Sequence, residues 1–299
     1  MELIERKISL HGLKVNFVEG GQGQPMIFLH NGGGFWQSWE HQLKHFANDF
    51  HVFGIDWPGF GESELPTGLI TLDLLTDSLR DFIHLKNLND VILVGNCIGG
   101  SAALKYSMQH PESVAKLLIF NICPGNLIYR YPWVRKTLVR LNDMPQIKDG
   151  VGKFLGFIFT KTLLKKAFPK MLFGPNADKQ SPLFQRYVQK FKQSTQTTSR
   201  INMVFSVHTF NLLNYIDDGA IPEHLLVWAD KNRVTPLIKH GFYHRDLLNP
   251  NQWRVIHDAG HLCMYEVPNE VNTLIKNYIS IKSNNKIGRK EYSTQTETV

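Results

Sequence analysis

The chain has 299 residues, of which 42% are hydrophobic and 11% aromatic, enough to bury the core of one large domain or of a domain with a lid. The formal charge is +7, but no basic repeat or nucleic-acid motif accompanies it, so no nucleic-acid partner is expected. The three cysteines (Cys97, Cys123 and Cys263) are an odd number in a long chain, which argues for a reducing compartment rather than a disulfide scaffold.

The chain ends and the metal-ligand residue types narrow the class further. The first residues include acids and no apolar run, so we expect neither a signal peptide nor a membrane span, and a cytoplasmic location. Cysteines and histidines do not cluster at zinc-finger spacing, and the run 261–263 alone is a weak indication of a metal site. No metal and no cofactor are therefore expected. The polar segment 283–299 is expected to be disordered.

Predicted strands and helices alternate along the first 123 residues. Residues 6–10 and 13–18 alternate apolar and polar side chains around His11-Gly12, which predicts a β-hairpin. Apolar runs predict further strands over 25–30, 51–56, 91–94 and 114–122. Apolar residues at helical spacing predict helices that end near Phe46, span 70–84 and end near His110.

The same alternation returns near the C-terminus, with strands predicted over 225–228 and 253–256 and a helix over 267–281. Such alternation is typical of a mostly parallel sheet with helices on both faces. The predicted fold class is therefore α/β, with residues 1–123 and 220–282 forming the core.

Residues 124–219 break this rhythm and predict an inserted helical lid. Helices without strands are expected over 133–141, 151–168, 183–192 and 198–215. The segment is rich in aromatic and basic residues. We expect most of the aromatics to pack the lid on the body, with the bases on a solvated face. The alternative is an apolar slot for an acyl or aromatic group, with a basic rim for an anionic part.

A strand that turns directly into a helix carries the strongest chemical signal. Residues 95–100 read Gly-x-Cys-x-Gly-Gly between the apolar strand 91–94 and a helical pattern. This is the pattern of a nucleophile elbow with Cys97 where serine is usual. Gly95 and Gly99 suit the crowding of such a turn, and a helix N-terminus favours a thiolate. The alternative is a glycine-rich turn with a buried structural cysteine.

Five motifs in order resemble the α/β-hydrolase superfamily, specifically its lidded members. They are residues 30–34 (His-Asn-Gly-Gly-Gly), 56–63 (Asp-Trp-Pro-Gly-Phe-Gly-Glu-Ser), the elbow, 228–236 and 258–261. Together they span about residues 8–280. The resemblance implies a mostly parallel α/β-hydrolase sheet with an inserted helical lid, Cys97 as the nucleophile and His261 as the general base. It also implies structural roles for His30 and for residues 56–63.

The third member of the triad is where the sequence departs from the family. The resemblance places Asn232 at the site of the usual aspartate, with Asp230 two residues earlier. A cysteine enzyme tolerates asparagine better than a serine enzyme, because a thiolate–imidazolium pair needs an orienting acceptor more than a counter-charge. We rank Asn232 first and Asp230 second; lost catalysis is the third reading. The oxyanion hole is expected from the backbone N–H groups of Ile98 and Gly32.

These residues predict a hydrolase that acts on an ester, thioester or lactone through an acyl-cysteine, with a small-molecule acyl or carbonyl substrate as its partner. Acyl transfer through the same intermediate is the close alternative. A non-catalytic ligand receptor on the same scaffold is an alternative of another class. Epoxide or haloalkane hydrolysis is not expected, because the members of the superfamily with those activities carry aspartate at the elbow.

Overall fold

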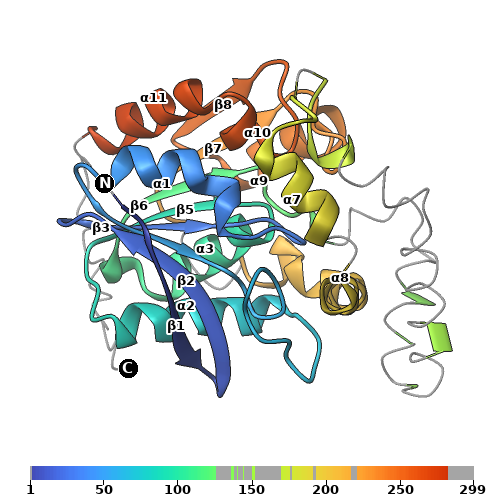
Figure 1. Ribbon diagram of the computed structural model, residues 1–299. Coiled ribbons are helices and arrows are strands. Elements are labelled where there is room, and N and C mark those ends of the chain that lie inside the picture. Colours follow the sequence, from blue (N-terminus) through green and yellow to red (C-terminus); the bar gives the residue numbers. More distant parts are fainter. Residues whose placement is uncertain are drawn as a thin grey trace, which may run out of the picture.

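The computed structural model describes residues 2–125, 170–175, 177–190, 193–216 and 221–281, with residues 136–137, 140, 144 and 150–151 between them. In this part of the chain, eight strands form one sheet in the order β1-β2-β4-β3-β5-β6-β7-β8 (Figure 1). The strands are β1 (Ile4–Leu10), β2 (Leu13–Gly20), β3 (Pro25–Leu29), β4 (His51–Ile55), β5 (Val91–Asn96), β6 (Val114–Phe120), β7 (His224–Ala229) and β8 (Gln252–Ile256).

The pairing confirms the mostly parallel sheet. β1 and β2 form the predicted antiparallel hairpin, and β2 also pairs antiparallel with β4. Every later pair is parallel, from β3–β4 to β7–β8. Because parallel strands end at the same edge, the segments that follow β3, β5, β6, β7 and β8 meet there.

Helices cover both faces of the sheet (Figure 1). One face carries α1, α10 and α11, and the other carries α2 and α3. The longer helices are α1 (Glu40–Phe46), α2 (Leu72–Leu85), α3 (Ile98–Gln109), α7 (Pro182–Lys190), α8 (Ser194–Ser206), α9 (Phe242–Leu248) and α11 (Pro268–Ile279), with the short α10 (Cys263–Glu266) before α11.

Strand periodicity divides the core into two apolar layers. Alternate residues of β3 point to opposite faces: Ile27 and Leu29 join the layer under α2 and α3, and Met26 and Phe28 join the layer under α1 and α11. Since all four side chains are fully buried, β3 reads as a continuous apolar run.

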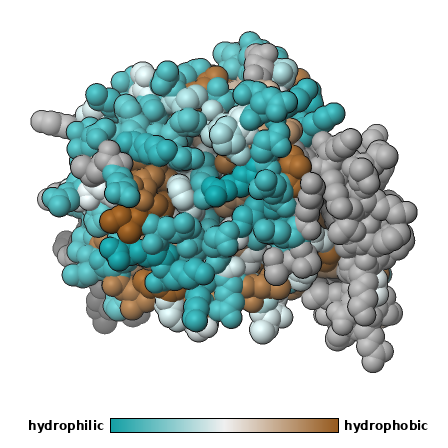
Figure 2. Space-filling model, in the orientation of Figure 1, coloured by the Kyte–Doolittle hydropathy of each residue, from teal (hydrophilic) through white to brown (hydrophobic). Residues whose placement is uncertain are grey.

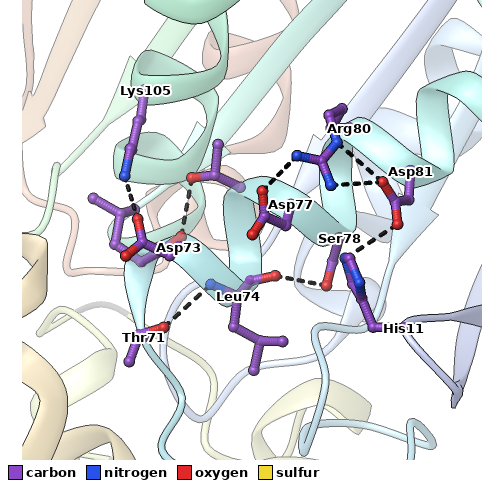
Figure 3. Close-up of polar contacts among 11 residues, drawn as sticks. His11, Thr71, Asp73, Leu74, Asp77, Ser78, Arg80, Asp81 and Lys105 are labelled. Carbon is purple, nitrogen blue, oxygen red and sulfur yellow. Dashed lines mark hydrogen bonds and ion pairs between the residues drawn. The ribbon is translucent and has the colours of Figure 1, made fainter.

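Polar contacts fix α2 against its neighbours (Figure 3). The Thr71 hydroxyl caps the helix by accepting the Leu74 N–H at 3.2 Å. Asp73 pairs with Lys105 of α3, and Asp81 pairs with His11 of the β1–β2 turn at 3.1 Å. The same helix therefore connects the elbow helix with the edge hairpin.

Two elements differ from the predictions. The expected helix 267–281 forms as α11, and the short α10 before it was not predicted. Pro268 disfavours a helical conformation at Val267, whose φ is −130°, so the two helices stay separate. Helix α9 was not predicted. Between β6 and β7 lie α7 and α8, which match two of the expected lid helices. The predicted helices 133–141 and 151–168 and the tail 283–299 lie outside the described residues.

The visible face of the molecule is mainly hydrophilic, with smaller hydrophobic patches (Figure 2). Among the helices of the described residues, none combines the length and the apolar character that crossing a membrane requires.

Candidate active site

Cys97 lies at the sharp turn between β5 and α3. Its φ of 56° and ψ of −114° are strained for a residue with a side chain. The turn is held because the Cys97 N–H donates to the Phe120 carbonyl of β6 at 2.9 Å, and the Cys97 carbonyl accepts from Ser101 at 3.0 Å. The predicted elbow is therefore present in the backbone.

The glycines of the elbow are required by close backbone approach. A Cβ on Gly95 would lie 2.5 Å from the Gly99 carbonyl carbon. A Cβ on Gly99 would lie 2.4 Å from the Leu29 carbonyl oxygen of β3. The first contact matches the expected crowding across the turn. The second has another origin, because it is the packing of α3 on β3 that excludes a side chain at residue 99.

Three groups surround the Cys97 sulfur. The side chains of Cys123 and His261 and the backbone N–H of Gly32 all make hydrogen-bonding contacts with it. The contact with Cys123 is the largest cause that holds the pKa of the Cys97 thiol well below its usual value; the His261 and Gly32 contacts act in the same direction and burial opposes them. Cys97 is 8% exposed and His261 1% exposed, so both residues are almost completely shielded from solvent.

His261 follows β8 and is held by its backbone. Its carbonyl oxygen accepts from the side-chain amides of Asn96 at 3.1 Å and Asn121 at 3.3 Å. Asn96 is the residue before the nucleophile position, and Asn121 follows β6 directly. Asn121 also accepts the Ala229 N–H at 2.9 Å. These two amides therefore fix the histidine loop relative to the elbow.

Among the described residues, neither candidate for the third triad position makes a hydrogen bond with the His261 ring. The Asn232 side-chain oxygen Oδ1 accepts the N–H groups of Val234 and Thr235, each at 3.0 Å. Asp230 accepts the Asp258 N–H at 2.8 Å and lies 3.3 Å from His257. Within that part of the chain, the buried Nδ1 of His261 has no hydrogen-bond partner. The structure therefore brings Cys97 and His261 together. Asn232 and Asp230 instead make local hydrogen bonds at the turn after β7.

The loop after β3 carries Gly32, whose backbone N–H is the expected oxyanion donor. The Gly32 N–H is directed at the Cys97 sulfur, and Ile98 begins α3 directly after Cys97. A Cβ on Gly32 would lie 2.6 Å from the end of the Met203 side chain of α8. Met203 therefore covers this loop, and the absence of a side chain at residue 32 lets it approach.

His30 holds the same loop, as expected. Its Nδ1 lies 2.7 Å from the Asn31 carbonyl, and its Nε2 accepts the Trp57 N–H at 2.9 Å. Nδ1 is consequently the protonated nitrogen of a neutral ring. Burial lowers the pKa of His30 to about 4, in agreement with that assignment.

A buried tyrosine of α7 connects the insertion to the loop after β3. The Tyr187 hydroxyl lies 2.8 Å from the Ser38 hydroxyl and donates to the Asn31 side chain at 3.2 Å. Its ring packs on Phe35 with 4.6 Å between centroids. Because Asn31 precedes Gly32, this contact holds the loop that places Gly32 beside Cys97.

A carboxylate ties the histidine loop to the segment before α7. Glu266 accepts the N–H groups of Gly260 at 3.0 Å and Gly174 at 2.8 Å. Burial raises the pKa of Glu266 to about 7 despite these two donors. A Cβ on Gly260 would lie 2.3 Å from the Gly174 nitrogen, so the two backbones are in direct contact.

Four residues that orient the site were not predicted from the sequence: Asn96, Asn121, Cys123 and Tyr187. The available signal was a polar residue at the end of a buried apolar strand, as at Asn96, the last residue of β5, and Asn121, the residue after β6. Cys123 and Tyr187 had no comparable local signal, because their importance depends on strand register and on the docking of α7.

Two surface cavities, each of about 510 Å³, lie away from the Cys97 sulfur. One is bounded by residues 59–65 and by Gln193 and Gln196, and the other lies between the C-terminal ends of α2 and α3. Within the described ranges, no group of three or more metal-ligating side chains is found.

Sheet order, elbow and histidine loop together define the class of an α/β-fold hydrolase. The comparison with protein families agrees, since residues 24–268 match the model of the alpha/beta hydrolase fold. The chain belongs to the alpha/beta hydrolase fold family.

Individual relatives extend this finding. The chain is 33% identical to "Epoxide hydrolase 4" of Mus musculus over 282 residues, which cover 90% of this chain and 77% of that protein. It is also 33% identical to "2-hydroxy-6-oxo-6-(2'-aminophenyl)hexa-2,4-dienoic acid hydrolase" of Metapseudomonas resinovorans over 249 residues, 76% of this chain and 85% of that one. A solved neighbour is the α/β hydrolase MGS-M2 from a Medee basin deep-sea metagenome library. Its TM-score is 0.76 at 16% identity, over 94% of this chain and 100% of that chain, and it supports the fold alone.

Proposed function

We propose that the protein hydrolyses an ester, thioester or lactone through an acyl-cysteine on Cys97. The single observation that carries this proposal is the set of groups around the sulfur: the His261 ring, the Gly32 N–H and the strained elbow backbone. A thiolate held in this way is a nucleophile, and a backbone N–H beside it is suited to the developing oxyanion.

In the first half of the reaction, His261 holds the proton that Cys97 has given up. The Cys97 thiolate forms a C–S bond to the substrate carbonyl, and the carbonyl π electrons move to oxygen. The N–H groups of Gly32 and Ile98 stabilise that oxyanion. When the intermediate collapses, the bond to the leaving group breaks and His261 gives that group a proton.

In the second half, His261 removes a proton from water, and the water oxygen attacks the thioester carbonyl. The C–S bond then breaks and returns the electron pair to Cys97. We assign orientation of the histidine to the backbone clamp of Asn96 and Asn121, because Asn232 and Asp230 are engaged elsewhere. The catalytic unit proposed is thus a Cys–His dyad.

We also propose that the insertion 124–219 acts as a lid over this site. Met203 of α8 lies over Gly32, and the Tyr187 hydroxyl of α7 donates a hydrogen bond to the side chain of Asn31, the residue before Gly32. Both helices belong to the insertion, so its placement affects the oxyanion loop directly.

The names of several relatives favour epoxide hydrolysis as a second candidate. Chemistry at Cys97 argues against turnover by that route. Opening an epoxide with a carboxylate leaves an ester, which water cleaves. Opening it with Cys97 leaves a thioether, which has no carbonyl for water to attack. We therefore expect an epoxide such as styrene oxide to alkylate Cys97 once and to inactivate the enzyme.

Mass spectrometry after incubation with a panel of p-nitrophenyl esters and acyl thioesters tests the proposal. We expect an acyl adduct on the tryptic peptide 87–105, which contains Cys97, and loss of turnover in Cys97→Ala and His261→Ala. Turnover that persists in Cys97→Ala would refute it. Ligand binding without turnover or adduct, with slow alkylation that His261→Ala leaves unchanged, would favour the receptor alternative. Added alcohol or thiol acceptors would separate acyl transfer from hydrolysis by their products.

A further inference from the structure

A second thiol lies against the sulfur of the elbow. Cys123 is 2% exposed and stands three residues beyond the end of β6, the strand that pairs with β5. Its N–H donates to the Cys97 carbonyl at 3.2 Å, so a hydrogen bond joins the two backbones directly. Their side chains are also in hydrogen-bonding contact. Strand register, rather than sequence spacing, thus places one thiol beside the other.

The direction of this side-chain hydrogen bond follows from the other neighbours of Cys123. The Gly125 N–H makes a hydrogen bond to the Cys123 sulfur. That bond leaves the Cys123 S–H hydrogen able to donate to Cys97, while His261, a base that can take the Cys97 proton, contacts the Cys97 sulfur. The Cys97 sulfur, in turn, receives the Gly32 N–H and faces His261, as an anion would require.

We propose that Cys123 is a positioning residue, whose thiol donates a hydrogen bond to the Cys97 thiolate and replaces part of the support that a third triad member would give. This proposal rests on the proposed role of Cys97 as nucleophile. Within the described residues, His261 Nδ1 has no hydrogen-bond partner, whereas the Cys97 sulfur has the Cys123 thiol beside it.

Protonation of the two thiols agrees with this direction. The contact with Cys123 is the first cause of the lowered pKa of Cys97, while the same contact, with burial, raises the pKa of Cys123 well above its usual value. Cys123 therefore remains a protonated donor where Cys97 is a thiolate.

The hydrogen bond acts in both halves of the reaction. It increases the fraction of Cys97 present as thiolate before attack, although a less basic thiolate is also a weaker nucleophile. During deacylation, the C–S bond breaks and its electron pair returns to the Cys97 sulfur. A donor already aimed at that sulfur makes it a better leaving group, so the larger effect is expected on deacylation.

The test measures the pH dependence of iodoacetamide labelling at Cys97 in the full-length protein. Tryptic peptides 87–105, 117–130 and 255–276 report Cys97, Cys123 and Cys263 separately. In the wild type we expect the labelling midpoint of Cys97 in mild acid. In Cys123→Ala we expect it to rise by at least about one pH unit, which is a tenfold loss of labelling rate below the midpoint. Cys123→Ser retains a donor and should keep most of the wild-type profile.

Cys263→Ala is the matched control, because Cys263 is also a fully buried thiol but contacts Asn121 rather than Cys97. It should leave the profile unchanged. Steady-state assays should show a lower kcat and more acyl-enzyme in Cys123→Ala than in Cys123→Ser.

An unmoved midpoint in Cys123→Ala would overturn the inference, and so would an equal shift in Cys123→Ser, since packing alone would then explain it. Failure of the proposed function looks different: the wild type itself would label slowly and His261→Ala would not change the rate.

Discussion

Asn232 illustrates, at the scale of single residues, how a local turn determines what a side chain does. Its side-chain oxygen Oδ1 accepts the N–H groups of Val234 and Thr235, and its side-chain Nδ2 donates to the Thr235 hydroxyl at 2.7 Å. Asparagine commonly closes turns in this way. The side chain is 3% exposed, so these bonds are buried and hold the turn after β7.

We predict that Asn232→Asp changes kcat/KM by no more than about threefold, because aspartate keeps both backbone bonds and the residue does not contact His261. His261→Ala, measured beside it on the same ester, should lose at least about a hundredfold. A tenfold gain or loss in Asn232→Asp would show that this residue serves the histidine during turnover.

Tyr187 is the second residue for which the structure makes a definite prediction. Removing its hydroxyl in Tyr187→Phe leaves the Ser38 hydroxyl and the Asn31 side chain without this partner in a buried site, while the ring still packs on Phe35. We expect a loss of about 1–2 kcal/mol in the free energy of unfolding and a lower kcat through displacement of Gly32. Tyr243→Phe, at a 39% exposed tyrosine of α9, is the control for urea denaturation and kinetics. Equal stability and kinetics in the two variants would contradict this role.

At the scale of elements, the elbow depends on how closely α3 packs on β3. The contact that excludes a side chain at Gly99 is with backbone atoms of Leu29, which cannot rotate away. At Gly32 the excluded space is occupied by the flexible end of Met203, which can move. The two glycines therefore differ: the first is required by the fold, and the second is compatible with alanine if α8 adjusts.

Gly99→Ala is accordingly expected to lower the free energy of unfolding by at least about 2–3 kcal/mol, since α3 has to move away from the sheet. Gly68→Ala is the matched control, because a Cβ there meets no atom within 4 Å. Urea denaturation should place Gly68→Ala within about 0.5 kcal/mol of the wild type. Similar midpoints for both variants would mean that the elbow relaxes without strain.

At the scale of the whole molecule, the features that could be predicted from the sequence are those that depend on local pattern. The β3 and β5 strands read directly as buried apolar runs, and the glycines around Cys97 predicted a turn whose φ of 56° the structure contains. Contacts that depend on register or docking were not predictable in this way. Cys123 meets Cys97 because β6 pairs with β5, and the Asn232 turn closes on itself rather than on His261. Neither contact could be predicted from the spacing of residues along the chain.

Buried titratable groups make the stability of the whole fold depend on pH, and His30 is the clearest case. It is fully buried and neutral, and burial lowers its pKa from 6.5 to about 4. Between these values the unfolded chain binds the proton that the folded chain excludes, so this histidine's contribution to stability rises with pH from about 4 to 6.5 and is lost as pH falls. The shift corresponds to at most about 3 kcal/mol.

Two buried carboxyls act in the opposite direction. Burial raises the pKa of Asp56 to about 6 and of Glu266 to about 7. In the folded state each holds its proton above the pH at which the unfolded chain releases it, so each contribution to stability is present at low pH and is lost as pH rises through the raised pKa. The pH dependence of the wild type is therefore a sum of opposing parts, and a variant is needed to isolate His30.

His30→Gln removes the titration while its side-chain oxygen can still accept the Trp57 N–H. We expect the variant to be less stable than the wild type at pH 7, with a difference that shrinks by up to about 3 kcal/mol toward pH 4, where the wild type loses the contribution of its neutral ring. Urea denaturation at several pH values measures this difference. His45→Gln, at an exposed position of α1, is the control and should run parallel to the wild type. A constant difference between His30→Gln and the wild type across this range would mean that His30 binds its proton equally well in the folded and unfolded chains.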